Sequence, residues 1–179
     1  MRILVMCEGP NEEVLLNSLL KANALKFTED DLIGRRVYPI RQLNIPIIQS
    51  ELKMYGKPVK IYRVGDTQND KIKIPNNLAH VVTSSEIYKY CTKPELEMLL
   101  ILNEGLEKEY EKVKSNTSPK DFAKKNIAYN GKKYNQSSQF LEEYFGGENV
   151  GNLIESIKKY KSYKRHNKRD ELYLADLLK

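Results

Sequence analysis

The chain has 179 residues, 40% of them hydrophobic, and carries a formal net charge of +6, which allows a nucleic-acid partner without requiring one. Its two cysteines, Cys7 and Cys91, have no histidine close by in the sequence, which argues against a zinc site or a disulfide scaffold. No apolar run reaches the roughly 20 residues of a membrane span, and the short apolar start does not fit a signal peptide, so we expect a cytoplasmic protein with no membrane partner.

The first predicted elements are an apolar strand, a turn and a helix. Residues Ile3–Cys7 form a continuous apolar run, which is typical of a strand buried on both faces of a parallel sheet. After the turn EGPN, apolar residues at helical spacing predict a helix over about 12–24. This order of elements is the opening unit of an α/β fold.

Three more strands and two more helices are predicted from apolar segments that are bounded by turn and helix-start residues. Pro46 lies at the start of one helix, where proline is tolerated, and Thr92 is the expected N-cap of the other. The segment KIKIP, at 71–75, fits either an added hairpin or a loop. In chain order, the predicted elements are strands over 36–40 and 59–64 with a helix over 46–55 between them, then a strand over 79–83 and a helix from 94 to about 113.

The character of the sequence changes after residue 115, where the remaining segments are helical, polar and rich in tyrosine. We therefore predict an α/β domain over 1–114, built on a small, mostly parallel central sheet of about four strands flanked by helices. The C-terminal residues 115–179 are predicted to form a helical, basic extension that packs on this domain.

Acidic residues follow two of the predicted strands. Glu8 comes directly after the first strand, and Asp66 follows the strand over 59–64. Glu12 begins the first helix, and Asp70 lies across the polar turn from Asp66. Ligands of open α/β sheets bind outside the carboxyl ends of the strands, so these carboxylates are expected to converge. Carboxylates without histidine or cysteine suit a hard cation, which predicts a Mg²⁺ or Mn²⁺ site.

The same acids have a plainer interpretation. Turns favour aspartate whatever the function of the protein. Glu12 could simply complement the dipole of the first helix. The residues alone leave both interpretations open.

The segments around these acids resemble those of a known family. LVMCEGPNEE followed by a helix resembles the first motif of TOPRIM domains, in which Glu-Gly follows an apolar strand and a second glutamate often comes four positions later. VKIYRVGD resembles the strand that carries the second motif of the family. KPELEMLLIL resembles the Pro-x-x-Glu segment that opens a long apolar helix in small OLD- and RloB-like members of phage-defence loci. The resemblance covers residues 1 to about 105.

The resemblance implies roles for individual acids. Glu8 matches the motif-one glutamate, which in the family is a metal ligand or an acid–base group, and Glu12 matches the second glutamate of the nuclease branch. Asp66 matches the first aspartate of the Asp-x-Asp motif, so Glu8 and Asp66 are the expected catalytic pair. The metal ligands that the resemblance implies are Glu8, Glu12, Asp66, Asp70 and Glu97.

The chain departs from the family at one position. Gln68 stands two residues after Asp66, where the Asp-x-Asp motif has its second acid, and the next acid is Asp70. Either Asp70 replaces the missing ligand through a longer loop, or the second metal is weak or absent. Glu97 matches the glutamate of the later helix, and Glu95 competes with it as a first-turn acid.

A dense basic run near the end of the chain has two interpretations. Basic side chains bind phosphates, and the interleaved Tyr160 and Tyr163 could stack on unpaired bases. The alternative is a solvated helix face with the two tyrosines packed inward. The basic residues of this run are Lys158, Lys159, Lys161, Lys164, Arg165, Lys168 and Arg169.

These features together predict a Mg²⁺- or Mn²⁺-dependent nuclease, or a related phosphodiester-processing enzyme, of TOPRIM type that acts on DNA or RNA. The resemblance adds phage defence or mobile-element biology as the setting and an ATPase as a partner. The main alternative is a catalytically degenerate TOPRIM-like module that binds nucleic acid or a partner ATPase. Gln68 favours this alternative, whereas the retained Glu8 and Glu12 favour the enzyme. A nucleotide-binding regulator is a third interpretation, which the absence of any nucleotide-binding motif weakens.

Overall fold

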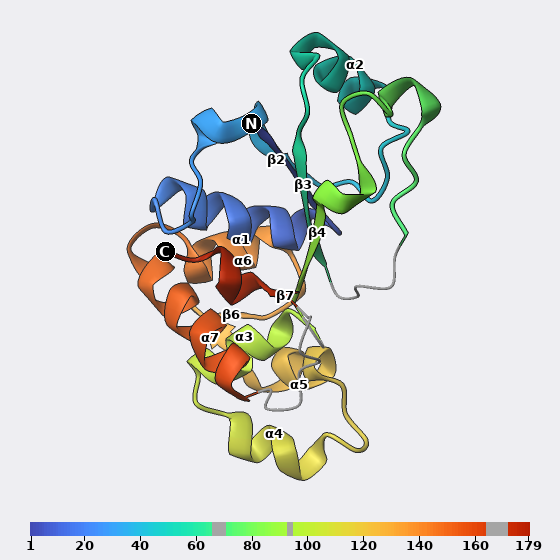
Figure 1. Ribbon diagram of the computed structural model, residues 1–179. Helices are drawn as coiled ribbons and strands as arrows, with labels where there is room; N and C mark the ends of the chain where they lie inside the picture. The colour runs from blue at the N-terminus through green and yellow to red at the C-terminus, as the bar shows by residue number, and fades with distance from the viewer. Residues whose placement is uncertain (66–70, 93–94, 164–171) are drawn as a thin grey trace.

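The central sheet confirms the predicted α/β fold. The computed structural model describes residues 1–65, 71–92, 95–163 and 172–179. Within that part of the chain, five strands form one sheet in the order β2-β1-β3-β4-β7, and every neighbouring pair is parallel (Figure 1). From edge to edge, the strands are β2 (Leu32–Tyr38), β1 (Ile3–Cys7), β3 (Lys60–Gly65), β4 (Ile87–Cys91) and β7 (Leu172–Tyr173).

The sheet is buried on both faces, as the continuous apolar run of β1 predicts. Successive side chains of a strand point to opposite faces. Accordingly, Ile3, Val5 and Cys7 belong to one hydrophobic cluster, and Leu4 and Met6 belong to another. The molecule therefore has three layers, with the sheet between two sets of covering elements.

One face of the sheet has more helical cover than the other. The larger cluster contains apolar residues of α1, α3, α6 and α7, whereas α2 covers the opposite face (Figure 1). Helix α5 packs on α3, close to a small antiparallel hairpin. The helices and the hairpin are α1 (Pro10–Lys21), α2 (Pro46–Tyr55), α3 (Glu97–Asn103), α4 (Glu107–Val113), α5 (Pro119–Asn126), β5 (Ala128–Tyr129), β6 (Lys132–Lys133), α6 (Ser138–Phe145) and α7 (Val150–Tyr163).

The strand predicted over 79–83 is wrong. The chain turns there, and Val81 and Val82 are buried in the core on the α2 side of the sheet. Their hydrophobicity therefore marks a loop that covers the sheet and not a strand of it. The fourth strand is instead β4, which begins only after a short 3-10 turn at Ser84–Glu86.

The helix predicted from 94 to about 113 is also wrong as a single element. Its described part is divided into α3 and α4, and Gly105 lies between them with φ +68°. That backbone conformation is left-handed, which interrupts a right-handed helix and suits glycine. The other boundaries differ less, since the first helix spans Pro10–Lys21 and β2 begins at Leu32, before its predicted start.

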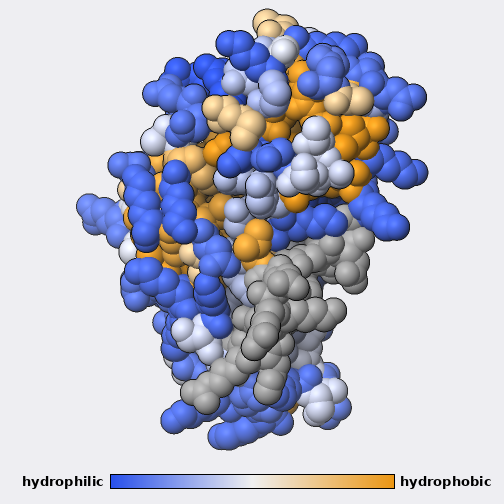
Figure 2. All heavy atoms as spheres, viewed as in Figure 1, coloured by the Kyte–Doolittle hydropathy of each residue, from blue (hydrophilic) through white to orange (hydrophobic). Residues whose placement is uncertain are grey.

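The C-terminal part of the chain packs on the same sheet. Helix α6 contacts α1, α7 contacts α3, and β7 pairs with β4. The division at residue 114 stays a prediction. None of the described helices is long and apolar enough to cross a membrane. In the face drawn in Figure 2, hydrophilic side chains cover the lower end of the molecule, where Figure 1 places α4.

Candidate acidic site at the carboxyl ends of the strands

The strand order defines a crevice between β1 and β3. From β1 the chain goes first to β2 on one side and later to β3 on the other. Such a reversal of direction leaves the carboxyl ends of the two inner strands open for a ligand. Glu8 directly follows β1, and Gly65 is the last residue of β3. The sheet thus places the first predicted acid at the position where α/β proteins bind their ligands.

The Glu8 side chain lies against the end of β3. A Cβ atom placed on Gly65 would be only 2.8 Å from Oε2 of Glu8, so the missing side chain of Gly65 makes room for the carboxylate. The other oxygen, Oε1, forms an ion pair of 2.9 Å with Nη2 of Arg41. Only 20% of the Glu8 side chain is exposed, against 63% of Arg41, so the carboxylate is the inner partner of the pair.

Three of the predicted metal ligands line one polar pocket of about 370 Å³. They are Glu8, Glu12 and Glu97, and the pocket wall also contains Glu95. Glu12 comes from the first turn of α1, and its Oε2 lies 3.5 Å from the position of a Cβ on Gly9. The pocket therefore brings together acids that are up to 89 residues apart, from Glu8 to Glu97, at one end of the sheet.

The two acids from the α3 side are held by specific hydrogen bonds. Glu97 is buried, and the hydroxyl of the buried Tyr134 donates to its Oε1 at 2.8 Å. Burial, followed by the charge of Glu97, raises the pKa of Tyr134, so the phenol stays protonated and remains a donor. Glu95 accepts a hydrogen bond of 3.1 Å from the backbone N–H of Lys120 at the start of α5. An acid at a helix N-terminus is favoured by the helix dipole.

Two cations and two amides that the sequence analysis did not identify complete the wall. They are Arg41, Lys120, Asn11 and Gln136. Asn11 holds the loop before α6 against α1, because its amide donates to the carbonyl of Gln136 at 3.3 Å and its Oδ1 accepts from Ser138 at 2.9 Å. Arg41, Lys120 and Gln136 lie outside the motif segments, and Asn11 lies within LVMCEGPNEE without being one of its acids, so only the packing of the chain identifies these four residues.

Cys7 lies beside this pocket as a neutral thiol. Burial, with smaller contributions from Glu12 and Glu13, raises the pKa of Cys7 to about 12. Its Sγ donates to the carbonyl of Gly9 at 3.4 Å. A thiol with such a pKa is not a nucleophile near neutral pH, which leaves the oxygen groups to carry the chemistry of the site.

The donor atoms fit a hard cation in kind, although they are not arranged as a complete ligand set. All four acids offer carboxylate oxygens, which Mg²⁺ and Mn²⁺ prefer. Among the described residues, however, no three acidic, histidine or cysteine side chains are grouped as metal ligands. Two other predicted ligands, Asp66 and Asp70, lie outside the described residues, as does Gln68. Asp66 directly follows Gly65 in the sequence.

The predicted basic run lies partly on α7, where its lysines are engaged within the protein. Lys158 pairs with Glu155 at 3.1 Å, and Lys161 pairs with Asp176. Lys159 pairs with Glu107 at 2.9 Å and lowers the pKa of that acid. The tyrosines of the run, Tyr160 and Tyr163, are buried and half-buried. Lys164, Arg165, Lys168 and Arg169 lie outside the described residues.

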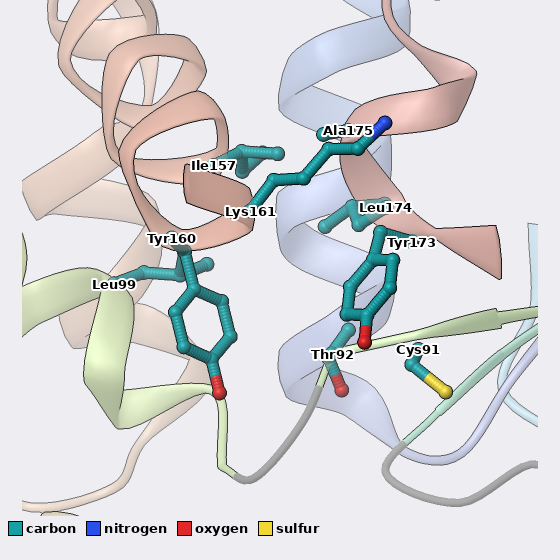
Figure 3. A pocket seen from close by; sticks show the side chains of 9 residues that line it. All are labelled: Cys91, Thr92, Leu99, Ile157, Tyr160, Lys161, Tyr173, Leu174 and Ala175. Atoms are coloured by element: carbon teal, nitrogen blue, oxygen red, sulfur yellow. The ribbon is translucent and has the colours of Figure 1, made fainter. Parts of the chain in front are cut away.

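A second hollow, between β4, α3, α7 and β7, is too small for a substrate. Its volume is about 10 Å³, which is room for a single water at most. Figure 3 shows the rings of Tyr160 and Tyr173, from α7 and β7, on either side of it. The acidic pocket is therefore the better candidate for a functional site.

Comparisons of the chain with protein-family models, with curated proteins and with solved structures find no match. The resemblance to TOPRIM domains stays a prediction that rests on the motif residues. The function is accordingly argued from the geometry of the acidic pocket.

Proposed function

We propose that the protein is a Mg²⁺- or Mn²⁺-dependent nuclease, or a related phosphodiester-processing enzyme, of TOPRIM type that acts on DNA or RNA in the cytoplasm. The supporting observation is that Glu8, Glu12 and Glu97 line one pocket at the open ends of β1 and β3. Phage defence or mobile-element biology, with an ATPase partner, is the setting that the motif resemblance implies.

The acids of the pocket would hold the cation. Glu8 and Glu12 line the pocket, and Asp66 follows Gly65, where the Glu8 carboxylate occupies the space of the missing side chain. Tyr134 orients Glu97 through its hydroxyl, as outer residues commonly orient a ligand. A bound cation in such a site activates water and neutralises charge on a phosphodiester.

The cations of the pocket would bind the substrate. Arg41 is exposed and reaches both the carboxylate and, at 3.4 Å, the carbonyl of Glu8. Lys120 lines the same pocket, at the start of α5. Guanidinium and ammonium groups bind phosphate oxygens, so a phosphodiester could lie between these side chains. Arg41 would then give up its ion pair with Glu8 and pair with a phosphate group instead.

A cleavage assay with two matched variants tests the proposal. The purified protein is incubated with supercoiled plasmid, single-stranded DNA and RNA, each in Mg²⁺, Mn²⁺ or a chelator. We expect cleavage only with a cation, and Glu8→Gln should lower its rate by more than the roughly 10–100-fold that a supporting residue contributes. Glu155→Gln removes the same charge from an exposed position on α7 and should leave the rate unchanged. Cation-independent rates, or equal rates for Glu8→Gln and the wild type, would falsify the proposal.

The ion pair between Glu8 and Arg41 favours a second candidate function. It neutralises the central acid, and the Gln68 position lacks the second acid of the motif. A degenerate TOPRIM-like module would bind nucleic acid or a partner ATPase without cleaving. In the same assay, such a module would shift the mobility of the nucleic acid while leaving all three substrates intact with either cation.

A further inference from the structure

A cationic hollow lies beside the acidic pocket. Its volume is about 410 Å³, and its wall contains three lysines and one acid. The lysines come from two separate segments, the last turn of α5 and the strand β6. The lining residues are Asn116, Thr117, Asp121, Lys124, Lys125 and Lys133.

The three lysines of this hollow are available for a ligand. Across residues 1–65, 71–92, 95–163 and 172–179, none of Lys124, Lys125 and Lys133 forms an ion pair. The neighbouring Lys132 behaves differently, since it pairs with Glu143 at 3.2 Å. The single acid, Asp121, accepts a hydrogen bond of 2.8 Å from Ser118. The hollow therefore keeps a net positive charge.

The dipole of α5 explains only part of this arrangement. Lysines in the last turn of a helix stabilise its C-terminus, which accounts for Lys124 and Lys125. Lys133 belongs to a different element, yet it faces the same hollow. Like charges from separate segments repel when they are brought together, so their convergence indicates an anionic ligand.

Two segments of the chain connect the hollow with the acidic pocket. On α5, Lys120 lines the acidic pocket and Lys124 lines the hollow, which is one helical turn, or about 6 Å, further along the axis. From β6, Lys133 lines the hollow and Gln136, three residues later, lines the acidic pocket. The same two segments therefore contribute to both pockets, and Lys120 and Lys124 follow one another along α5 from the acidic pocket to the hollow.

We propose that this lysine hollow binds the sugar–phosphate backbone of a nucleic-acid strand and leads it into the acidic pocket. The proposal rests on the proposed function, for which it supplies the path of the substrate. A nucleic acid fits because it is a linear polyanion whose regular charges can occupy successive lysines along such a row. This surface is separate from the α7 lysines Lys158, Lys159 and Lys161, each of which forms an ion pair with an acid of the protein.

Binding without a cation tests the proposal separately from cleavage. Labelled oligothymidylate and oligouridylate of equal length are titrated with protein in a chelator, and fluorescence anisotropy gives Kd over a range of salt concentrations. We expect the double variant Lys124→Gln/Lys133→Gln to bind at least about tenfold more weakly and to lose about 1.4 from the slope of log K against log salt, since each phosphate contact on a single strand contributes about 0.7. Lys125→Gln alone should weaken binding less, and thermal unfolding checks that each variant folds.

A matched control separates local contacts from net charge. Lys53→Gln/Lys57→Gln removes two charges from exposed lysines of α2 and the loop after it. This control should bind like the wild type. The two oligonucleotides distinguish a DNA path from an RNA path. The proposal is overturned if neither oligonucleotide binds, if the control weakens binding as much, or if an acidic peptide competes as well as the oligonucleotides do.

Discussion

The position of the Glu8 carboxylate depends on a residue without a side chain. Gly65 ends β3, and a Cβ there would lie 2.8 Å from Oε2 of Glu8 and 3.0 Å from Nη1 of the buried Arg63. The backbone of Gly65 does not have a positive φ, so its conformation does not require glycine. Glycine is needed here because a side chain would overlap with the Glu8 carboxylate. The Glu8 carboxylate, at the end of β1, therefore occupies the space that a side chain at the end of β3 would fill.

We expect Gly65→Ala to fold but to lose activity. The added methyl group meets the far ends of the Glu8 and Arg63 side chains, and also the Cβ of Glu8 at 3.3 Å, but no backbone atom, so the free energy of unfolding should fall by about 1–3 kcal/mol. The displaced Glu8 carboxylate should lower cation-dependent cleavage by about tenfold or more, because catalytic groups act within narrow geometric limits. Urea denaturation and initial cleavage rates measure the two effects.

Gly151→Ala is the matched control for this change. It adds the same methyl group to α7, where the new Cβ meets no atom within 4 Å. This variant should cleave at the wild-type rate. A Gly65→Ala protein that is also fully active would show that Glu8 can act from another position.

The sequence pointed to the acids of the pocket and not to its cations. Glu8 and Glu12 stand in a short motif between a strand and a helix, so local pattern is enough to select them. Arg41 lies in a loop and Lys120 in the first turn of a helix, where basic residues are common. Their approach to the acids depends on how α2 and α5 pack, which a local pattern does not encode. The roles of all these side chains stay predictions.

At the scale of single elements, the start of α5 determines where two lysines lie. Ser118 is the N-cap of α5, and its Oγ accepts a hydrogen bond of 3.1 Å from the backbone N–H of Asp121 and donates one to its carboxylate. Pro119 occupies the first helical position, where its missing N–H is not needed. This fixed start places Lys120 in the wall of the acidic pocket and Lys124 in the wall of the lysine hollow.

Removing the cap should destabilise the protein moderately. We expect Ser118→Ala to lower the free energy of unfolding by about 1 kcal/mol, which is typical of a lost N-cap. Ser118→Thr keeps both the acceptor and the donor at the cap and should stay within about 0.5 kcal/mol of the wild type. Urea denaturation of the three proteins at one pH measures these differences. Equal stability of Ser118→Ala and the wild type would mean that the cap contributes nothing.

Elements with strong local patterns were predictable, and elements fixed by tertiary contacts were not. The apolar run of β1 and the proline-led helix α2 have the bounds that the sequence predicts. β4 was missed because three of its five side chains are half-buried tyrosine, isoleucine and lysine, which lack a clear apolar pattern. β7 has two residues, too few for any periodicity, and forms by pairing with the end of β4.

At the scale of the whole molecule, residues 172–179 add the edge strand beside β4 and then pack back on the domain. β7 extends the sheet beside β4, and the next residues return to the loop after α1. The backbone of Lys26 donates to the carbonyl of Leu177 at 2.9 Å, and the backbone of Lys179 donates to Ala24 at 3.0 Å. Lys161 of α7 adds an ion pair with Asp176. Segments about 150 residues apart in the sequence are thus joined.

Removing residues 172–179 should therefore abolish cooperative folding. Tyr173, Leu174, Leu177 and Leu178 are each no more than 6% exposed. Burying one large apolar side chain contributes about 1.5–3 kcal/mol, so their loss approaches the 5–15 kcal/mol of a whole domain. We expect circular dichroism of the truncated chain to show no cooperative transition in urea at 25 °C. Leu177→Ala should instead keep the transition and lose about 2–5 kcal/mol. A truncated chain with nearly intact stability would mean that this segment is an addition to a fold complete without it.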